Sequence, residues 1–548
     1  MRKYQQKQLL ELTQTLAEAN AELESLFSCG DFDAVMQLLV DCQGFVVQMG
    51  EFIEATEGKG TRTVTLLEEC HDDLYNVSIE MVDGTAKPNA TKRLRKKIIA
   101  IETSIKTELK ANKIEIVFFP YKASMWDSFE SVWFAAKDDP HCDVYVVPIP
   151  YYDKLPGGAL GQMRYEGGEY PEYVPVVDWN EYDMEEQHPD IVFVHNPYDN
   201  HNHVTSVHPS YYSSELKKHT DFLAYIDYGL PIWQYLTPEK ADLLPALYIY
   251  DLFFVYSEEY AGNMRYNLKP DRKLRRAAAQ RDNVAALGSP KIDAVINTSR
   301  EGYVLPDSWA SLIEGKKILL FSTSLSAVFQ GGENFIVGQR ETFEALRGRG
   351  DIVLWWRPHP LSETTFASTR PQLLEEYNKI VGEYRAEGWG IYDDTPELHR
   401  AIAWSDACYS DESSLLLLYL ATGKPFVVRE FSHKPENHVT DLSLDFTPIL
   451  ETRIKSMQSA RGANVFGGNY TIWWHNFVDG DFVNDISYGN FMDRFIHFIL
   501  NEADYPDAEL YRQLKLEMLH EFVKNPDGTA GKKIYEFAKK KYIGVDGI

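Results

Sequence analysis

The chain has 548 residues, of which 44% are hydrophobic and 25% are charged. This length suggests about three or four domains, and this composition is ordinary for a globular protein and excludes a disordered one. Lysine and arginine number 55 against 82 aspartates and glutamates, which gives a formal net charge of −27. A field of this sign repels nucleic acid, so no nucleic-acid partner is expected, and an anionic ligand needs a local positive site.

The cysteines and the hydropathy pattern indicate a cytoplasmic protein. Five cysteines are scattered along the chain without a CxxC pair, which argues against a disulfide framework and a cysteine-based zinc site. The N-terminus shows no secretory apolar block. The longest apolar run near a motif, 415–421, is far shorter than the ~20 residues of a membrane span. Peripheral contact with the inner face of the cell membrane stays open.

Residues 1–110 are predicted to form a helical or coiled-coil N-terminal extension. Apolar residues recur at three- and four-residue steps in several segments, and the first of these segments contains Leu9, Leu12, Leu16 and Leu23. A packing module is the first interpretation, and homo-oligomerisation through these helices is another. The basic cluster at 92–97 is interpreted as a solvated helix face, with docking to a membrane or an acceptor as the alternative.

From residue 111 the pattern changes to short β-branched and aromatic runs with spacers that can hold helices. This alternation is typical of a parallel sheet and predicts a first Rossmann-like domain at 111–300. Its strands are expected at 114–119, 144–149, 191–194, 222–226 and 252–256.

A second series of runs predicts another Rossmann-like domain at 301–500. Its strands are expected at 318–321, 352–356, 407–409 and 426–428. The segment 286–293 between the two series is a plausible hinge, and residues 501–548 are expected to be helices that pack back on the body. The predicted fold class is therefore α/β, with two facing parallel-sheet domains after a helical extension. Ligands of such sheets bind at the carboxyl ends of the strands.

Two loops of the second domain carry residues that suit phosphate. Arg357 and His359 belong to an Arg-Pro-His-Pro sequence directly after a strand, where arginine can clamp a phosphate and histidine can donate a hydrogen bond. Ser410, Ser413 and Ser414 lie between the next strand and the start of a helix, where serine hydroxyls add to free backbone N–H groups. N-capping explains these serines equally well when they are considered alone.

Two further positions complete the candidate site. Thr323 ends the first strand of the second series, where its hydroxyl could meet a phosphate or an acceptor. His195 ends a strand of the first domain and has polar neighbours, so it is a candidate general base, with a structural histidine as the competing interpretation. The chain contains no GxxxxGK[ST] and no GxSxG sequence, which argues against a P-loop and an α/β-hydrolase.

The order of these motifs resembles the CDP-glycerol glycerophosphotransferase family of teichoic-acid enzymes. The matching elements are GSPKID, a strand ending in Ser-Thr-Ser, RPHP, a Ser-Ser helix start and TGKPFVV, over about residues 280–430. The resemblance implies a GT-B fold, and it implies that no metal or other cofactor is needed. It also implies that the first domain, 111–300, is on the acceptor side and the second, 301–500, is on the side of the nucleotide donor. There His359, with Arg357 beside it, and Ser413 and Ser414 would hold the donor pyrophosphate.

The sequence departs from the family pattern at two positions. The base of that family is a histidine in a WHG-P motif, and the nearest match here, Asp227 to Pro231, has Tyr228 in its place. An ordinary tyrosine, with a pKa near 10, is a poor base at neutral pH. An acidic residue expected four positions after the second serine is replaced by Leu418. The base is therefore expected at His195, or at His208, unless the activity is altered or lost.

Three functions follow as alternatives. The first is a metal-independent transferase that moves a glycerol-phosphate-type group from a CDP-activated donor to a cell-surface polymer or glycan. The second is a GT-B glycosyltransferase that uses a CMP-sugar or another nucleotide sugar. The third is a catalytically degenerate GT-B scaffold.

Overall fold

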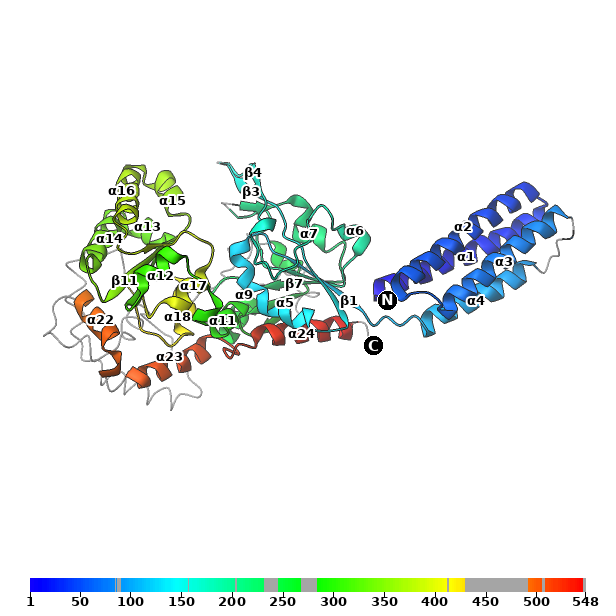
Figure 1. Ribbon diagram of the computed structural model, residues 1–548. Coiled ribbons are helices and arrows are strands. Elements are labelled where there is room, and N and C mark those ends of the chain that lie inside the picture. The colour runs from blue at the N-terminus through cyan, green and yellow to red at the C-terminus, as the bar shows by residue number, and fades with distance from the viewer. Residues whose placement is uncertain are drawn as a thin grey trace.

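The computed structural model describes residues 1–83, 85, 90–155, 157–202, 205–230, 245–267, 283–411, 413–428, 491–504 and 508–545. Pro231, the last residue of the motif that aligns with WHG-P, lies outside these ranges. Figure 1 shows a helical bundle at one end of the molecule, followed by two α/β domains. In the described part of the chain, no helix is both long enough and apolar enough to cross a bilayer.

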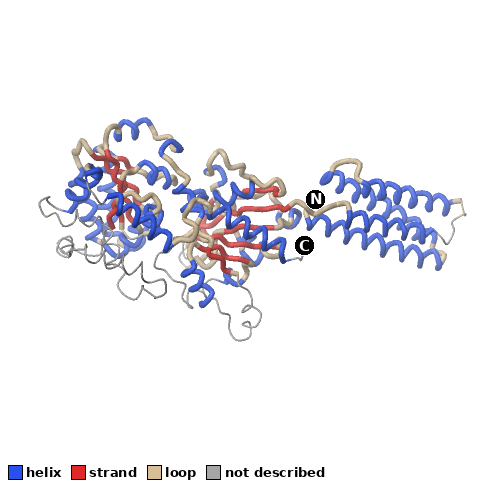
Figure 2. Tube along the Cα trace, turned by 90° about the horizontal axis from the view of Figure 1, so that it is seen from below, coloured by secondary structure: helices blue, strands red, loops and turns tan. Residues whose placement is uncertain are grey.

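The N-terminal extension is a bundle of four helices, which confirms the predicted helical region. The helices are α1 (Lys3–Cys29), α2 (Phe32–Glu57), α3 (Arg62–Val82) and α4 (Ala90–Thr107). Their apolar residues recur with helical periodicity and fill one core that contains Leu9, Leu39, Leu67 and Ile101. Figure 2 shows the bundle projecting away from the first α/β domain.

The first α/β domain contains a parallel sheet of six strands in the order β2-β1-β5-β7-β8-β9. Because both of its faces are covered, the central strands are continuous apolar runs. The strands are β1 (Ile114–Phe119), β2 (Cys142–Val146), β5 (Ile191–Val194), β7 (Phe222–Ile226), β8 (Leu252–Val255) and β9 (Val284–Ala286). The helices are η1 (Ala123–Ser128), α5 (Glu130–Lys137), η2 (Gly167–Glu169), α6 (Met184–Gln187), η3 (Pro209–Tyr211), α7 (Ser213–Leu216), η4 (Pro245–Tyr248) and α9 (Glu258–Asn267).

A small antiparallel sheet in the order β4-β3-β6 is attached to this domain and was not expected from the sequence. Its strands are β3 (Tyr151–Lys154), β4 (Leu160–Arg164) and β6 (Thr205–Val207). The first two are largely polar and partly exposed, so they lack the apolar run that marks the parallel strands.

The second α/β domain contains a parallel sheet of five strands in the order β12-β11-β10-β13-β14. The strands are β10 (Lys317–Thr323), β11 (Ile352–Pro358), β12 (Ile391–Tyr392), β13 (Ala407–Ser410) and β14 (Phe426–Val428). The helices are η5 (Arg300–Gly302), α12 (Asp307–Ile313), α13 (Leu325–Gly331), α14 (Glu333–Leu346), α15 (Ser362–Thr369), α16 (Pro371–Glu387), α17 (Leu398–Trp404) and α18 (Ser414–Leu420). The two parallel-sheet domains confirm the predicted GT-B type of fold.

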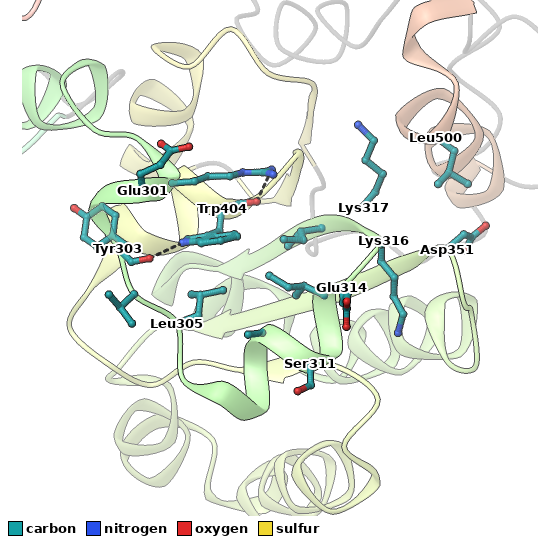
Figure 3. Close-up of a pocket in the computed structure, with 16 residues that line it drawn as sticks. Glu301, Tyr303, Leu305, Ser311, Glu314, Lys316, Lys317, Asp351, Trp404 and Leu500 are labelled. Carbon is teal, nitrogen blue, oxygen red and sulfur yellow. Dashed lines mark hydrogen bonds between the residues drawn. The ribbon is translucent and has the colours of Figure 1, made fainter.

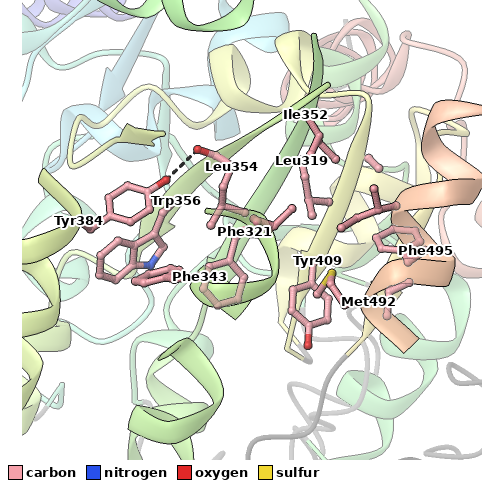
Figure 4. Packing of buried hydrophobic residues seen from close by; sticks show 14 of the residues in the cluster. Leu319, Phe321, Phe343, Ile352, Leu354, Trp356, Tyr384, Tyr409, Met492 and Phe495 are labelled. Atoms are coloured by element: carbon pink, nitrogen blue, oxygen red, sulfur yellow. Dashed lines mark hydrogen bonds between the residues drawn. The ribbon is translucent and has the colours of Figure 1, made fainter. Parts of the chain in front are cut away.

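One face of the second sheet packs against aromatic side chains and a C-terminal helix. Figure 4 shows Phe321, Trp356 and Tyr409 of the strands in a cluster that also contains Phe343 of α14. Helix α22 (Phe491–Leu500) adds Phe495, which is fully buried in the same cluster. The apolar side chains of α22 therefore complete the core of the second domain.

The chain passes between the two domains at two adjacent places. The first is the segment from β9 to α11 (Pro290–Ile296), and the second links α23 (Ala508–Phe522) to α24 (Ala530–Val545). A short helix, η7 (Glu502–Asp504), follows α22. Helix α23 packs against α18 of the second domain, whereas α24 packs against α5 of the first domain. Gly288 has a φ of +101° and lies so close to Lys524 O that a Cβ atom there would clash at 2.3 Å.

Candidate functional site

The loops predicted to bind phosphate follow strands that end level with one another. In the parallel register, Thr323 of β10 pairs with Pro358 of β11, and Ser322 pairs with Ser410 of β13. His359 and Ser413 therefore lie at the same carboxyl edge of the second sheet. Strand β10 lies between β11 and β13, so the two loops are about 10 Å apart, which is two strand spacings.

The imidazole of His359 has a fixed tautomer and a fixed direction. Its Nδ1 accepts a hydrogen bond from the backbone N–H of Leu361 at 3.1 Å, so the neutral ring carries its proton on Nε2. Burial, Lys122 and Arg357 lower the pKa of His359, in that order of importance. The half-buried ring is therefore neutral at pH 7 and presents Nε2–H as a hydrogen-bond donor.

The guanidinium of Arg357 does not face the edge as the predicted clamp requires. Its Nη1 donates to the carboxylate of Asp393 at 2.8 Å, and its Nη2 donates to the carbonyl oxygen of Thr395 at 2.6 Å. Asp393 is fully buried and also accepts a hydrogen bond from the indole N–H of Trp355 at 3.0 Å. The positive charge of Arg357 is thus compensated inside the protein, where it ties β11 to the loop after β12.

The hydroxyl groups predicted for the donor site fall into two groups. Ser410 is buried and donates to the carbonyl oxygen of Asp411 at 3.0 Å, so its hydroxyl already has a partner. Ser413 caps α18 without a side-chain capping bond, and Ser414 is exposed. The hydroxyl of Thr323 is buried and has no hydrogen-bond partner in the described residues. Ser413 and Ser414 therefore keep hydroxyls that a ligand could bind, whereas the hydroxyl of Thr323 is unpaired among the described residues but enclosed.

His195 has the surroundings of a structural histidine rather than those of a general base. It is fully buried, stacks on Phe129 with ring centroids 4.6 Å apart, and accepts a hydrogen bond at Nε2 from the backbone N–H of Tyr121 at 3.4 Å. Its Nδ1 lies 2.9 Å from the hydroxyl of Ser128. Burial and the charge of Lys291 lower the pKa of His195 to about 3. Both ring nitrogens are occupied, so nothing here supports the predicted role of His195 as a base.

The polar neighbours of His195, Asn196 and Asp199, have other hydrogen-bond partners. Asp199 accepts hydrogen bonds from the backbone N–H and the hydroxyl of Ser213, at 2.9 and 2.7 Å. The side chain of Asn196 accepts from the backbone N–H of Tyr198 at 3.2 Å. His208, the second candidate for the base, caps η3 by accepting from the N–H of Ser210. Its ring also lies near those of Tyr152 and Trp179, with centroids 5.9 and 5.5 Å away.

Asp227 is a candidate for the base that the sequence interpretation overlooked. It directly follows β7, and one carboxylate oxygen accepts from the N–H of Gly229 at 2.9 Å and from the hydroxyl of Tyr225 at 3.1 Å. Burial raises the pKa of Asp227 to about 6, although these hydrogen bonds and Lys291 oppose the shift. Burial raises the pKa of the neighbouring Tyr228 further above its usual range. The signal in the sequence is an acidic residue directly after a buried strand, next to Tyr228.

The carboxyl-end loops of the two sheets meet at a buried ionic cluster. Asp127, in the segment after β1, has one carboxylate oxygen 2.8 Å from His399 Nε2 of α17 and the other 3.2 Å from Lys291 Nζ of α11. Burial raises the pKa of Asp127, but Lys291 and His399 overcome this effect and lower it to about 2. This cluster joins the first domain, the segment between the domains and the second domain.

Lys424, in the Gly-Lys-Pro turn before β14, has a structural role. Its ammonium group donates to the carbonyl oxygens of Ile402, Ala403 and Ser405 at 2.7–3.0 Å. These carbonyls lie at the C-terminal end of α17, where a cation is favourable. The ammonium group has three N–H bonds, so all its donors are used.

A groove of about 900 Å³ lies at the amino ends of the strands of the second sheet, opposite the candidate site (Figure 3). Its lining includes Tyr303, Trp404 and Lys317, the residue that begins β10. The indole N–H of Trp404 donates to the backbone carbonyl oxygen of Tyr303 at 3.1 Å. None of the predicted site residues lines this groove. The groove and the candidate site are therefore at different ends of the strands.

No protein-family model matches the chain, and no curated protein matches it. Solved structures with a similar fold include a Staphylococcus aureus MnaA–UDP complex at 15% identity and a TM-score of 0.40, covering 78% of this chain and 96% of that one. A putative UDP-N-acetylglucosamine 2-epimerase from Listeria monocytogenes matches at 15% identity and 0.42, covering 79% and 97%.

The wall teichoic acid polymerase TagF also matches, at 11% identity and a TM-score of 0.40, covering 88% of this chain and 99% of that one. The matches thus include an enzyme of the teichoic-acid class to which the motif order is similar. Identities and TM-scores this low describe a similar chain path.

Proposed function

We propose that the chain is a metal-independent transferase that moves a glycerol-phosphate-type group from a CDP-activated donor to a polymer or glycan acceptor. The observation that carries the proposal is the Nε2–H of His359, which is fixed by the bond from Leu361 to Nδ1. It lies at the same sheet edge as the hydroxyls of Ser413, Ser414 and Thr323. Neutral donors around one edge suit the oxygens of a diphosphate, and the motif resemblance supports CDP-glycerol as the donor.

In the proposed reaction, an acceptor hydroxyl oxygen attacks the phosphorus that carries glycerol. The new bond joins that oxygen to phosphorus, and the bond between phosphorus and the oxygen that bridges the two phosphates breaks, so CMP leaves with the bonding electrons. His359 Nε2–H donates a hydrogen bond to a phosphate oxygen of the CDP-activated substrate and stabilises the negative charge that develops on that oxygen. Ser413 and Ser414 hold the remaining phosphate oxygens.

The proton of the acceptor hydroxyl goes to a base of the first domain, and we assign this role to Asp227 in place of His195. One carboxylate oxygen of Asp227 is fixed by Gly229 and Tyr225. A carboxylate with a pKa of about 6 is largely ionised at pH 7 and is more basic than an ordinary aspartate.

Calorimetric titration with CDP-glycerol, a CMP-sugar and a UDP-sugar tests the donor. CDP-glycerol is expected to bind most tightly, and His359→Ala and the double variant Ser413→Ala/Ser414→Ala are each expected to weaken it. Ser410→Ala is the matched control, because the hydroxyl of Ser410 already donates to Asp411. Preference for a nucleotide sugar would favour the glycosyltransferase alternative. Failure to bind any nucleotide would favour the degenerate scaffold.

A further inference from the structure

The loop that carries Lys122 belongs to the first domain but contacts the second. Strand β1 ends at Phe119 and η1 begins at Ala123, so Lys122 lies at the carboxyl edge of the first sheet. Asp127, in the same short helix η1, reaches His399 of the second domain at 2.8 Å. This contact places the segment from Lys122 to Asp127 at the junction of the two domains.

The ammonium group of Lys122 lies against two tyrosine rings. Its Nζ is 5.8 Å from the centroid of Tyr121 and 5.2 Å from that of Tyr151, within the range of cation–π attraction. The two rings meet edge to face with centroids 5.6 Å apart. Within the described ranges, no carboxylate lies within ion-pair distance of Lys122, so its charge is stabilised but not neutralised.

Glu166 fixes the positions of the Tyr151 ring and of the backbone next to Lys122. One of its carboxylate oxygens accepts from the hydroxyl of Tyr151 at 2.6 Å, and the other accepts from the backbone N–H of Ala123 at 2.8 Å. The ring under the ammonium group and the backbone next to Lys122 are thus held by the same carboxylate. Such support keeps a side chain in place before a ligand binds.

His359 of the second domain is close enough to respond to this charge. After burial, Lys122 is the next largest cause that lowers the pKa of His359. The charge of Lys122 therefore acts on His359 from the other domain and favours the neutral form of the imidazole.

We propose that Lys122 binds a phosphate oxygen of the donor, so that the anion site is shared between the two domains. This inference rests on the proposed function for the identity of the donor. The binding of a phosphate anion by Lys122 does not depend on that function. The chain has a net charge of −27, and the charge of Arg357 is compensated by Asp393, so a diphosphate at this edge needs another cation. Lys122 supplies it from the first domain.

The test is calorimetric titration of the full chain with inorganic pyrophosphate and with CDP-glycerol at low ionic strength. Lys122→Gln is expected to weaken both by about 10–100-fold, as for the loss of a hydrogen bond to a charged group. Lys122→Arg, which keeps the charge, is expected to retain most of the affinity for pyrophosphate. The matched control is Lys137→Gln, because Lys137 also lies over an aromatic ring, with Nζ 4.5 Å from the centroid of Trp133, but it is on α5.

Pyrophosphate binding that is equal in the wild type and in Lys122→Gln overturns the inference, as does a wild type that binds no pyrophosphate. If pyrophosphate binds through Lys122 but CDP-glycerol does not bind, the shared anion site stands and the proposed donor is wrong. Unchanged melting temperatures confirm that the variants are folded. A weakened Lys137→Gln variant would show a general charge effect and would also overturn the inference.

Discussion

The backbone N–H of Gly531 donates a hydrogen bond of 2.7 Å to the carboxylate of Asp293, which links the two places where the chain passes between the domains. The other carboxylate oxygen of Asp293 accepts from the N–H of Ala530 at 3.1 Å. Asp293 belongs to α11 and is fully buried, whereas Ala530 begins α24. A side chain of the GSPKID motif therefore caps the C-terminal helix, a role that the motif alone does not reveal.

Asp293→Ala is expected to lower the free energy of unfolding by about 1–3 kcal/mol, because two buried N–H groups lose their acceptor. Chemical denaturation followed by circular dichroism measures this change. Asp527→Ala is the control, since Asp527 is on the surface and accepts from the N–H of Thr529 at 3.1 Å. Equal losses in the two variants would show that the buried cap contributes nothing special.

Arg357→Met is expected to destabilise the protein by about 1.5–3 kcal/mol, because it removes a charged hydrogen bond to the buried carboxylate of Asp393 and leaves the more distant Arg400, at 3.6 Å, to compensate the charge. The double variant Arg357→Met/Asp393→Asn should recover part of this loss, since the weakly compensated charge is removed as well. Thermal unfolding without ligand measures both effects. A small change in stability together with a large loss of nucleotide affinity would restore Arg357 to its predicted role as a phosphate clamp.

The strands that could be predicted from the sequence are those that are buried on both faces. Runs such as 191–194 and 352–356 are apolar throughout, because helices cover both sides of the sheet. Strand β12 was missed since it has only two residues, and β4 was missed since it is polar and mostly exposed. Apolar periodicity is the main signal for these elements, and neither strand has it.

The positions of the candidate residues along the chain were predictable, but the directions of their side chains were not. The sequence places His359 and Arg357 in one loop region. Of these two, His359 keeps a hydrogen-bond donor that is free among the described residues, at the carboxyl ends of the strands. Arg357 turns to Asp393, a residue 36 positions later. His195 was placed correctly at the end of a strand, but its burial depends on Phe129 and Tyr121 of another segment. Contacts between distant segments decided each role.

His195 is expected to make the stability of the protein depend on pH. Its pKa is lowered to about 3 in the folded state, so below pH 6.5 the unfolded chain binds a proton that the folded chain does not. Wild-type stability should therefore fall as the pH drops from 6.5 to 4, and His195→Gln should show a shallower fall. Denaturant unfolding at several pH values measures the difference. Parallel curves would mean that His195 is not held neutral by burial.

Asp227→Asn is expected to reduce the release of CMP from the donor by about 10²–10⁴-fold, because it removes the group that accepts the proton. In the wild type, the rate should rise with pH through about 6 as the carboxylate of Asp227 ionises, and the variant should lack this rise. The control is Asp221→Asn, since Asp221 is exposed and precedes β7 at the other edge of the sheet.

Stability gives a second measure of Asp227 that does not depend on the assay. Its folded pKa of about 6 lies above that of an ordinary aspartate, so the ionised carboxylate destabilises the fold above pH 6, and this penalty disappears below about pH 4. Asp227→Asn should therefore raise the melting temperature at pH 8 and leave it unchanged at pH 4. A variant that gains stability but keeps full activity would show that Asp227 is buried without being the base. If His195→Gln then lost activity while remaining folded, the base would be His195, as the sequence first suggested.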